Sequence, residues 1–317
     1  MKTILLTATA LTALTFGVAL ADYPERAIEI TVPSPAGGGT DTSVRRLASI
    51  LEAQLGAPLA VLNVAGGGGS VGVTQFMQAR PDGYRLLATW NSPITTVPLV
   101  QQTAYQPDSF TPIASTSETA YTLCVKPDFP AETGEEMLAE LAANPGRYTY
   151  GNDGIGGTMQ LAAERIFQAR GIEAVPIPFG GAGETLQNFL GNHVDIYGGS
   201  ISPVLPYEQS GEAKCLIVTS ASPVEALPLA DGLESLGLGA EETLLWRMIL
   251  GPADLDPAIV ATLETAIEAA VNDPDYVAFL ASQGEVPNVM PGDELSQRLQ
   301  SEYDALAEVA QALGLSQ

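Results

Sequence analysis

The sequence has little positive charge. Its 13 lysines and arginines stand against 37 aspartates and glutamates, and the net charge is −24. Such a chain repels polyanions, so nucleic acid and anionic membrane surfaces are excluded as partners. The ordinary interpretation of this acidity is a well-solvated surface. Because salt screens charges over about 10 Å, a small anion can still bind where local donors are built for it.

Histidine and cysteine are scarce as well. The single histidine, His193, and the two cysteines, Cys124 and Cys215, are too few and too far apart for a metal site, and we expect neither a metal nor a cofactor. An even cysteine count permits a disulfide in an oxidising compartment. The sequence does not show whether the two thiols face each other. A disulfide and two buried free thiols therefore both stay open, and free thiols are the preferred interpretation.

The first residues predict export. Lys2 is followed by an apolar run at 4–20 that closes on small residues before Asp22. This is the pattern of a secretory signal, and the run is short for a membrane span, which is the alternative interpretation. We expect a signal peptide at residues 1–21, cleavage before Asp22 and a mature protein free in the periplasm.

Hydrophobic periodicity predicts alternating strands and helices. Strand, glycine turn and helix follow one another twice, at 28–55 and 59–79, and a third strand follows at 84–89. This order is typical of an α/β lobe with a parallel sheet. An irregular, Pro- and Thr-rich stretch at 91–119 precedes a second α/β region.

The chain is longer than one ordinary core needs, so we expect two lobes. Residues 22–105 and 222–317 are assigned to lobe 1, and residues 106–221 to lobe 2. Two strands are expected to cross between the lobes as a hinge.

Two glycine-rich loops, each between a strand and a helix, are candidate anion sites. Consecutive glycines let successive N–H groups converge on one anion at the positive end of a helix. Both loops leave the sheet at its carboxyl edge, where ligands bind, so together they predict an anion cradle without a cation. A tight turn without a ligand is the alternative for either loop alone. The candidates are Ser34, Ala36, Gly37, Gly38, Gly39 and Asp41 in the first loop, and Gly67, Gly68, Gly69 and Ser70 in the second.

The second loop also matches two enzyme patterns. Gly67–Gly72 fits the dinucleotide fingerprint G-x-G-x-x-G, but the ribose-binding acid expected about 20 residues on is missing. Gly68–Gly72 fits the nucleophile elbow G-x-S-x-G around Ser70. His193 falls in the other predicted lobe, and the residue order is not that of the hydrolase fold. A secreted Ser70 esterase is kept as an alternative, and a protein that is not an enzyme is preferred.

Two loops of the second region, at 151–158 and 178–184, again separate a strand from a helix. Four such loops in two lobes would face one cleft, which is how a closing ligand trap is built. Trp90 and Asn91 end a strand of the first lobe and could line this cleft, with core packing as the alternative for Trp90. The candidates of the second region are Asn152, Gly156, Thr158, Phe179, Gly180, Gly199 and Ser200.

Taken together, the motifs resemble the Bug receptors, the extracytoplasmic solute-binding proteins of tripartite tricarboxylate transporters. The resemblance covers nearly all of the mature chain and rests on Pro33–Asp41, Gly66–Gly72, Arg80–Tyr84, Gly151–Thr158 and Val194-Asp195. It implies a two-lobed type II periplasmic-binding-protein fold that delivers its solute to membrane permease subunits. It also implies a carboxylate held by backbone amides and ordered waters at the two first-lobe loops.

Departures from the family pattern bear on the ligand. Ser34 stands where the family commonly has an aromatic residue, and Phe179-Gly180-Gly181 lacks a frequent lysine. Gly199 and Ser200 occupy a segment that often carries an acid, which would pair with an ammonium group. These differences predict a roomier, less charged second-lobe pocket and a small mono- or dicarboxylate, aromatic ones included. We expect a monomer that binds by lobe closure, and a ligand-sensing partner of a signalling receptor is the remaining alternative.

Overall fold

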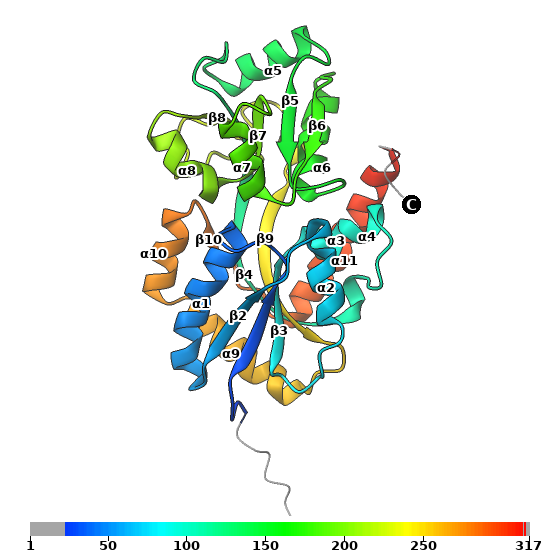
Figure 1. The fold of residues 1–317 in the computed structure, drawn as a ribbon, viewed down its shortest axis with the longest axis vertical. Coiled ribbons are helices and arrows are strands. Elements are labelled where there is room, and N and C mark those ends of the chain that lie inside the picture. Colours follow the sequence, from blue (N-terminus) through cyan, green and yellow to red (C-terminus); the bar gives the residue numbers. More distant parts are fainter. Residues whose placement is uncertain (1–22, 313, 315–317) are drawn as a thin grey trace, which may run out of the picture.

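The structure, a computed structural model, describes residues 23–312 and residue 314. The predicted signal peptide and its cleavage site before Asp22 lie outside these residues. Figure 1 shows two lobes stacked along the long axis of the molecule and joined by long strands. Within the described residues, no helix has the length and apolar character needed to cross a membrane.

The first lobe is built on three parallel strands in the order β2-β1-β3. Leu86 and Ala88 pack into one core, and Leu87 between them packs into another, because helices cover both faces of the sheet. The strands are β1 (Ile28–Val32), β2 (Leu59–Asn63) and β3 (Arg85–Trp90). The helices are α1 (Gly39–Leu55), α9 (Pro257–Val271) and α10 (Pro274–Ser282) on one face, and α2 (Ser70–Phe76) and α11 (Gly292–Ala312) on the other.

The second lobe repeats the α/β design. Its strand β5 pairs in parallel with β6 on one side and with β7 on the other. The strands are β5 (Thr149–Asn152), β6 (Val175–Pro178), β7 (Ile196–Ser200) and β8 (Lys214–Val218). The helices are α5 (Gly134–Ala143), α6 (Thr158–Ala169), α7 (Ala182–Leu190) and α8 (Ile201–Gln209).

Two neighbouring antiparallel strands, which we call the hinge strands, join the lobes: β4 (Phe110–Val125) and β9 (Leu244–Pro252). Strand β9 pairs with β3 of the first lobe. Strand β4 pairs with β9 from Phe110 to Ala120 and with β7 from Tyr121 onward, so it passes from one sheet to the other at that point. The expected hinge of two crossing strands is therefore present (Figure 1). The exact limits of the lobes stay a prediction.

The stretch at 91–119, predicted as irregular, contains most of hinge strand β4. The prediction failed there because Pro112 and a run of Ser and Thr residues hide the strand pattern. These polar side chains are buried but satisfied: the Ser115 hydroxyl donates to the Asn288 carbonyl, and the Thr119 hydroxyl donates to the Gly284 carbonyl. Short elements fill the rest of the stretch and other connections: α3 (Ser92–Thr95), α4 (Val97–Val100), η1 (Gly67–Gly69), η2 (Pro107–Ser109), η3 (Gly239–Glu241) and β10 (Val286–Pro287).

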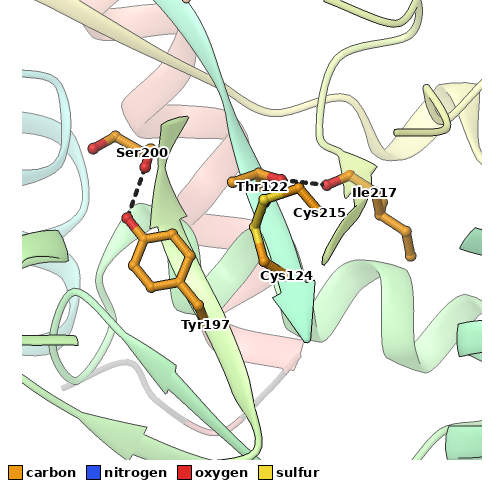
Figure 2. Close-up of a disulfide and its surroundings, with 6 residues drawn as sticks. All are labelled: Thr122, Cys124, Tyr197, Ser200, Cys215 and Ile217. Atoms are coloured by element: carbon orange, nitrogen blue, oxygen red, sulfur yellow. Dashed lines mark hydrogen bonds between the residues drawn. A yellow bond between two sulfur atoms is a disulfide. The ribbon is translucent and has the colours of Figure 1, made fainter. Parts of the chain in front are cut away.

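Cys124 and Cys215 form a disulfide. They lie directly opposite each other on the antiparallel strands β4 and β8, as Figure 2 shows. The preferred interpretation, two free thiols, is wrong. The two residues are 91 positions apart in the chain, and only the pairing of the strands brings their side chains together.

Candidate functional site

A cavity of about 510 Å³ lies between the lobes, lined by residues of both lobes and of the hinge strands. The first lobe contributes the loop after β1 and the end of β3, and the second lobe contributes the loop after β5, the loop before α7 with the first part of that helix, and the end of β7. The lining residues are Ser34, Pro35, Ala36, Gly37, Gly38, Gly39, Thr40, Trp90, Tyr121, Asp153, Gly180, Gly181, Ala182, Gly183, Glu184, Gln187, Gly199, Ser200, Leu245 and Arg247.

The first glycine loop lines this cavity through Ser34, Ala36, Gly37, Gly38 and Gly39. That these residues bind a ligand stays a prediction. Asp41 shapes the loop from behind: its carboxylate accepts a hydrogen bond from the Gly37 amide at 2.8 Å and pairs with Arg45 at 2.9 Å. Burial opposes ionisation of Asp41, but the hydrogen bonds from Arg45, Gly37 and Asn63 outweigh it and keep the pKa of this carboxyl below its ordinary value. Asp41 is therefore a buried support of the loop and does not line the cavity.

The second glycine loop, Gly67 to Ser70, is not among the residues that line the cavity. A side chain at Gly69 would lie 2.6 Å from Pro93 and 3.4 Å from the Trp90 ring, so this loop packs against the end of β3 and helix α3. Only a residue without a side chain permits this close contact, and the backbone φ of Gly69, 99°, also favours glycine. The two loops that the sequence paired as one cradle are therefore not brought together at the cavity, and the second loop supports Trp90 instead.

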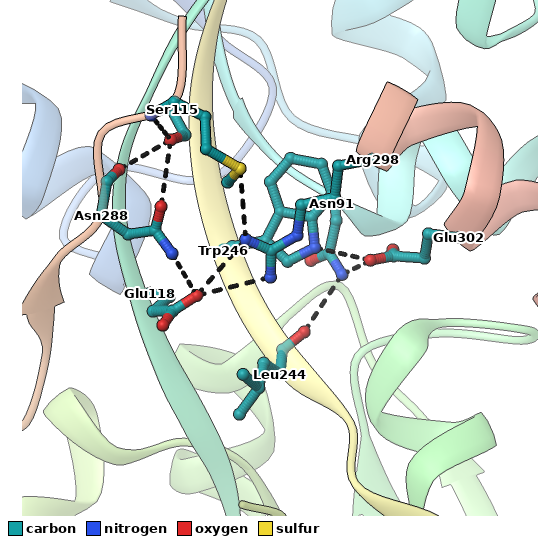
Figure 3. A network of polar contacts seen from close by, with 9 residues as sticks. Asn91, Ser115, Glu118, Leu244, Trp246, Asn288, Arg298 and Glu302 are labelled. Atoms are coloured by element: carbon teal, nitrogen blue, oxygen red, sulfur yellow. Dashed lines mark hydrogen bonds and ion pairs between the residues drawn. The ribbon is translucent and has the colours of Figure 1, made fainter. Parts of the chain in front are cut away.

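Trp90 lines the cavity, whereas the neighbouring Asn91 belongs to a buried polar network (Figure 3). The Asn91 amide donates to the Glu302 carboxylate at 2.8 Å and to the Leu244 carbonyl at 3.2 Å. Glu302 also accepts a hydrogen bond from the Trp246 indole at 2.6 Å. Burial raises the pKa of Glu302, and these donors act against that rise. Asn91 therefore ties helix α11 to hinge strand β9 and does not reach the cavity.

Among the second-lobe candidates, Gly180, Gly199 and Ser200 line the cavity. The others lie behind it. Thr158 is buried against the first lobe, and Asn152 is buried with its amide nitrogen unpaired within the described structure. Phe179 packs over Gly151, and a side chain at Gly156 would overlap Val100.

Sequence reasoning missed Arg247, a cation at this cavity. Its side chain is 2% exposed and forms an ion pair with Glu285, which is 1% exposed. The Arg247 Nε also donates to the Thr40 hydroxyl at 3.2 Å. A signal was available: Arg247 is the one charge within the apolar strand Leu244–Leu250, and a buried charge requires a partner.

Tyr121, on the other hinge strand, was also missed. Its hydroxyl is buried at the cavity and interacts with the Thr158 side chain without forming a hydrogen bond of ordinary geometry. The Ser34 hydroxyl at the first loop is buried without a hydrogen-bond partner among the described residues. Burial raises the pKa of Tyr121 well above its ordinary value, so the hydroxyl stays protonated. Both hydroxyls are therefore available as hydrogen-bond donors.

Asp153, beside the candidate Asn152, lines the second-lobe side of the cavity together with Glu184. Burial raises the pKa of Asp153 to about 6, while the backbone amides of Met159 and other residues act against that rise. The Met159 amide donates to this carboxylate at 3.2 Å, which caps the start of α6. Two acidic residues therefore lie on the second-lobe side of the cavity, and a pocket less charged than those of other family members stays a prediction.

No group of three or more His, Cys, Asp or Glu side chains in the described part of the chain is arranged to hold a metal ion. Ser70 starts helix α2 in the first lobe, whereas His193 follows α7 in the second lobe, where its ring lies against Gly191. Among the hydrogen bonds of the described residues, none joins these two side chains.

Comparison with known proteins adds independent findings. Residues 43–315 match the model of the tripartite tricarboxylate transporter family receptor. Protein BugT of Bordetella pertussis is 28% identical over 300 residues, which cover 92% of this chain and 90% of BugT. The structure of the periplasmic binding protein BugD is similar with a TM-score of 0.86 and 27% identity, covering 93% of this chain and 99% of BugD. The structure of MatC from Rhodopseudomonas palustris with bound malate is similar with a TM-score of 0.81 and 25% identity, covering 90% of this chain and 99% of MatC. The expected two-lobed periplasmic-binding-protein fold is confirmed by these likenesses.

Proposed function

The chain belongs to the tripartite tricarboxylate transporter receptor family, as the resemblance in its motifs predicted, and we propose that it captures a small mono- or dicarboxylate, aromatic ones included, between its two lobes. Captured solute is then delivered to the membrane permease subunits of a tripartite transporter. The protein acts as a periplasmic monomer after cleavage before Asp22, without catalysing a reaction.

One observation carries this proposal: the glycine loop at Ala36–Gly39 lines a cavity to which both lobes contribute. The loop leads into the N-terminus of α1, where backbone N–H groups and the helix dipole favour an anion. A ligand held there would contact both lobes, which couples binding to closure. The cavity volume of about 510 Å³ suits a small organic acid.

The likeness to malate-bound MatC supports a carboxylate as the ligand class. Family membership supports delivery to a permease and a place outside the cytoplasm. Export also accords with the disulfide, because disulfides persist in oxidising compartments.

Isothermal calorimetry against a panel of carboxylates tests the ligand class. The panel contains succinate, malate, adipate, acetate and benzoate, and each acid has its uncharged amide as a control. We expect saturable binding of at least one acid and no binding of its amide. Absence of binding by every acid would refute the proposal. Uptake of the bound acid by cells that carry or lack the permease genes tests delivery, and a sensing role would leave uptake unchanged.

The alternative of a Ser70 esterase is tested by labelling with a fluorophosphonate. We expect no covalent adduct at Ser70, because the only histidine of the chain lies in the second lobe. An adduct that the Ser70→Ala variant loses would favour the esterase.

A further inference from the structure

We propose that Arg247 and Tyr121, one from each hinge strand, donate hydrogen bonds directly to the carboxylate of the ligand, with Glu285 as the residue that positions Arg247. This inference rests on the proposed function and specifies how the same cavity holds its ligand. It departs from the expectation that peptide N–H groups alone, without a cation, hold the negative group.

The two side chains reach the cavity from neighbouring strands. Arg247 belongs to β9 and Tyr121 to β4, and these strands are paired along most of β9. Both residues line the cavity, together with Leu245 of β9. The hinge strands therefore form a cavity wall that carries one guanidinium and one hydroxyl.

Two of the three guanidinium nitrogens of Arg247 have protein partners. Nη1 is bound to the Glu285 carboxylate, and Nε donates to the Thr40 hydroxyl. Nη2 faces the first glycine loop: a Cβ atom at Gly39 would lie 2.9 Å from it. The absence of a side chain at Gly39 thus lets the guanidinium approach the N-terminus of α1, at the end of the cavity that is expected to hold the anion.

Tyr121 supplies the second donor. Its side chain is buried at the cavity, and its hydroxyl forms no hydrogen bond of ordinary geometry within the described structure. The hydroxyl interacts with the Thr158 side chain, but a buried polar group without a well-formed hydrogen bond is costly, and a ligand that accepts from it removes this cost. A carboxylate oxygen would accept from this hydroxyl and from Arg247, and charge-assisted hydrogen bonds are the stronger kind.

Electrostatics favours one negative group at this place. The guanidinium and the N-terminus of α1 are both positive and lie close together, and Glu285 compensates the guanidinium. The acidic residues Asp153 and Glu184 belong to the second-lobe side of the same cavity, so the positive groups favour an anion at the first-lobe side. An arrangement buried to this degree is poorly screened by salt. Local positive groups can therefore hold an anion on a chain whose net charge is −24.

Arg247 and Glu285 could instead serve only to join β9 to the segment after α10. A purely structural pair predicts loss of stability without a specific loss of affinity when both charges are removed together. Neutral replacement of both partners avoids an unpaired buried charge, which a single substitution would leave behind.

The experiment compares the Arg247→Met/Glu285→Gln and Tyr121→Phe variants with the parent protein by calorimetry. Arg298→Gln is the matched control: Arg298 stacks on Trp246 of the same strand and pairs with Glu118, but it does not line the cavity. The probes are the five acids of the panel above. For each acid that binds the parent, we expect the double variant to lose about 10- to 150-fold in affinity, the range for hydrogen bonds to charged groups. Tyr121→Phe should lose about 3- to 10-fold, and Arg298→Gln less than about 2-fold.

NMR of protein labelled with ¹⁵N-arginine gives a second measurement. The Arg247 side-chain signal should not respond to the ligand if Arg247 has only a structural role. Addition of a bound acid should shift the side-chain signal of Arg247, assigned by its loss in the double variant, and leave that of Arg298 in place. Unchanged affinity in the folded double variant, or an unmoved Arg247 signal at saturation, would overturn the inference while leaving the proposed function intact. If no acid binds the parent, both are wrong.

Discussion

The hydroxyls of Thr96 and Thr158 are hydrogen-bonded to each other at 3.0 Å, although one follows α3 in the first lobe and the other starts α6 in the second. The Thr158 amide adds a second contact by donating to the Ser92 hydroxyl at 3.2 Å. The two lobes therefore touch through defined polar contacts beside the cavity, and these contacts exist only while the lobes are together.

Removal of this contact should weaken ligand binding, although Thr158 does not line the cavity. Thr158→Val keeps the shape of the side chain but loses the hydroxyl, and one hydrogen bond is worth about 0.5–1.5 kcal/mol. We expect an approximately 2- to 10-fold loss of affinity in calorimetry. Thr262→Val, which removes an exposed hydroxyl on α9, is the control and should bind like the parent. Equal affinity for Thr158→Val and Thr262→Val would show that the contact does not contribute to closure.

Gly39 is expected to be intolerant of alanine. A Cβ at Gly39 would lie 2.9 Å from Arg247 Nη2, whereas at Gly239, which does not line the cavity, the nearest atom is the Glu234 Cα at 3.8 Å. Overpacking of this kind costs about 1–3 kcal/mol. Gly39→Ala should therefore lower affinity by about fivefold or more, and the control Gly239→Ala should bind like the parent. Calorimetry compares the two variants, and equal dissociation constants would contradict the expectation.

The disulfide between Cys124 and Cys215 should contribute substantially to stability because it closes a long loop. Loss of such a crosslink typically costs about 2–4 kcal/mol. The Cys124→Ala/Cys215→Ala variant should therefore unfold at lower urea concentration than the oxidised parent, and reduction of the parent should have a similar effect. A coincident unfolding curve for variant and parent would count against this expectation.

Asp153 should make stability depend on pH in the weakly acidic range. Its pKa in the folded protein is about 6, above the ordinary 3.8, because burial disfavours the charged form. The folded state then binds more protons than the unfolded state between these values, so stability falls as pH rises from about 4 to about 6. Relative to Asp153→Asn, the parent should lose up to about 3 kcal/mol of unfolding free energy over this range. Urea titrations of both proteins at several pH values measure this loss. A difference in unfolding free energy that stays constant with pH would refute the raised pKa of Asp153.

Local patterns predicted local structure well. The strand, glycine turn and helix at β1 and α1 follow from a period-2 run, a glycine loop and an amphipathic run, and this loop lines the cavity. The features that the sequence analysis missed depend on contacts between residues that are distant in the chain. Glu285 neutralises Arg247 from 38 residues away, and the two cysteines meet only because β4 and β8 are neighbours.

The second glycine loop shows a subtler limit. Its glycines were interpreted as part of an anion cradle, but the group that comes close to Gly69 is Pro93, together with the Trp90 ring. A glycine shows that something comes near the backbone and does not show whether it is a ligand or a side chain. Helix α3, which was not predicted, decides between the two here.

The passage of β4 from one sheet to the other at Ala120–Tyr121 has a mechanical implication. When the two lobes rotate about the shared hinge strands, residues near the rotation axis move least, and residues far from it move most. Tyr121 lies at the point where β4 changes sheets and Arg247 pairs with Ser117 close to it, whereas the loop at Gly180 belongs to the second lobe. A ligand would therefore contact nearly the same hinge residues in the open and the closed form, so recognition of its carboxylate can precede the lobe closure that encloses the rest of the molecule.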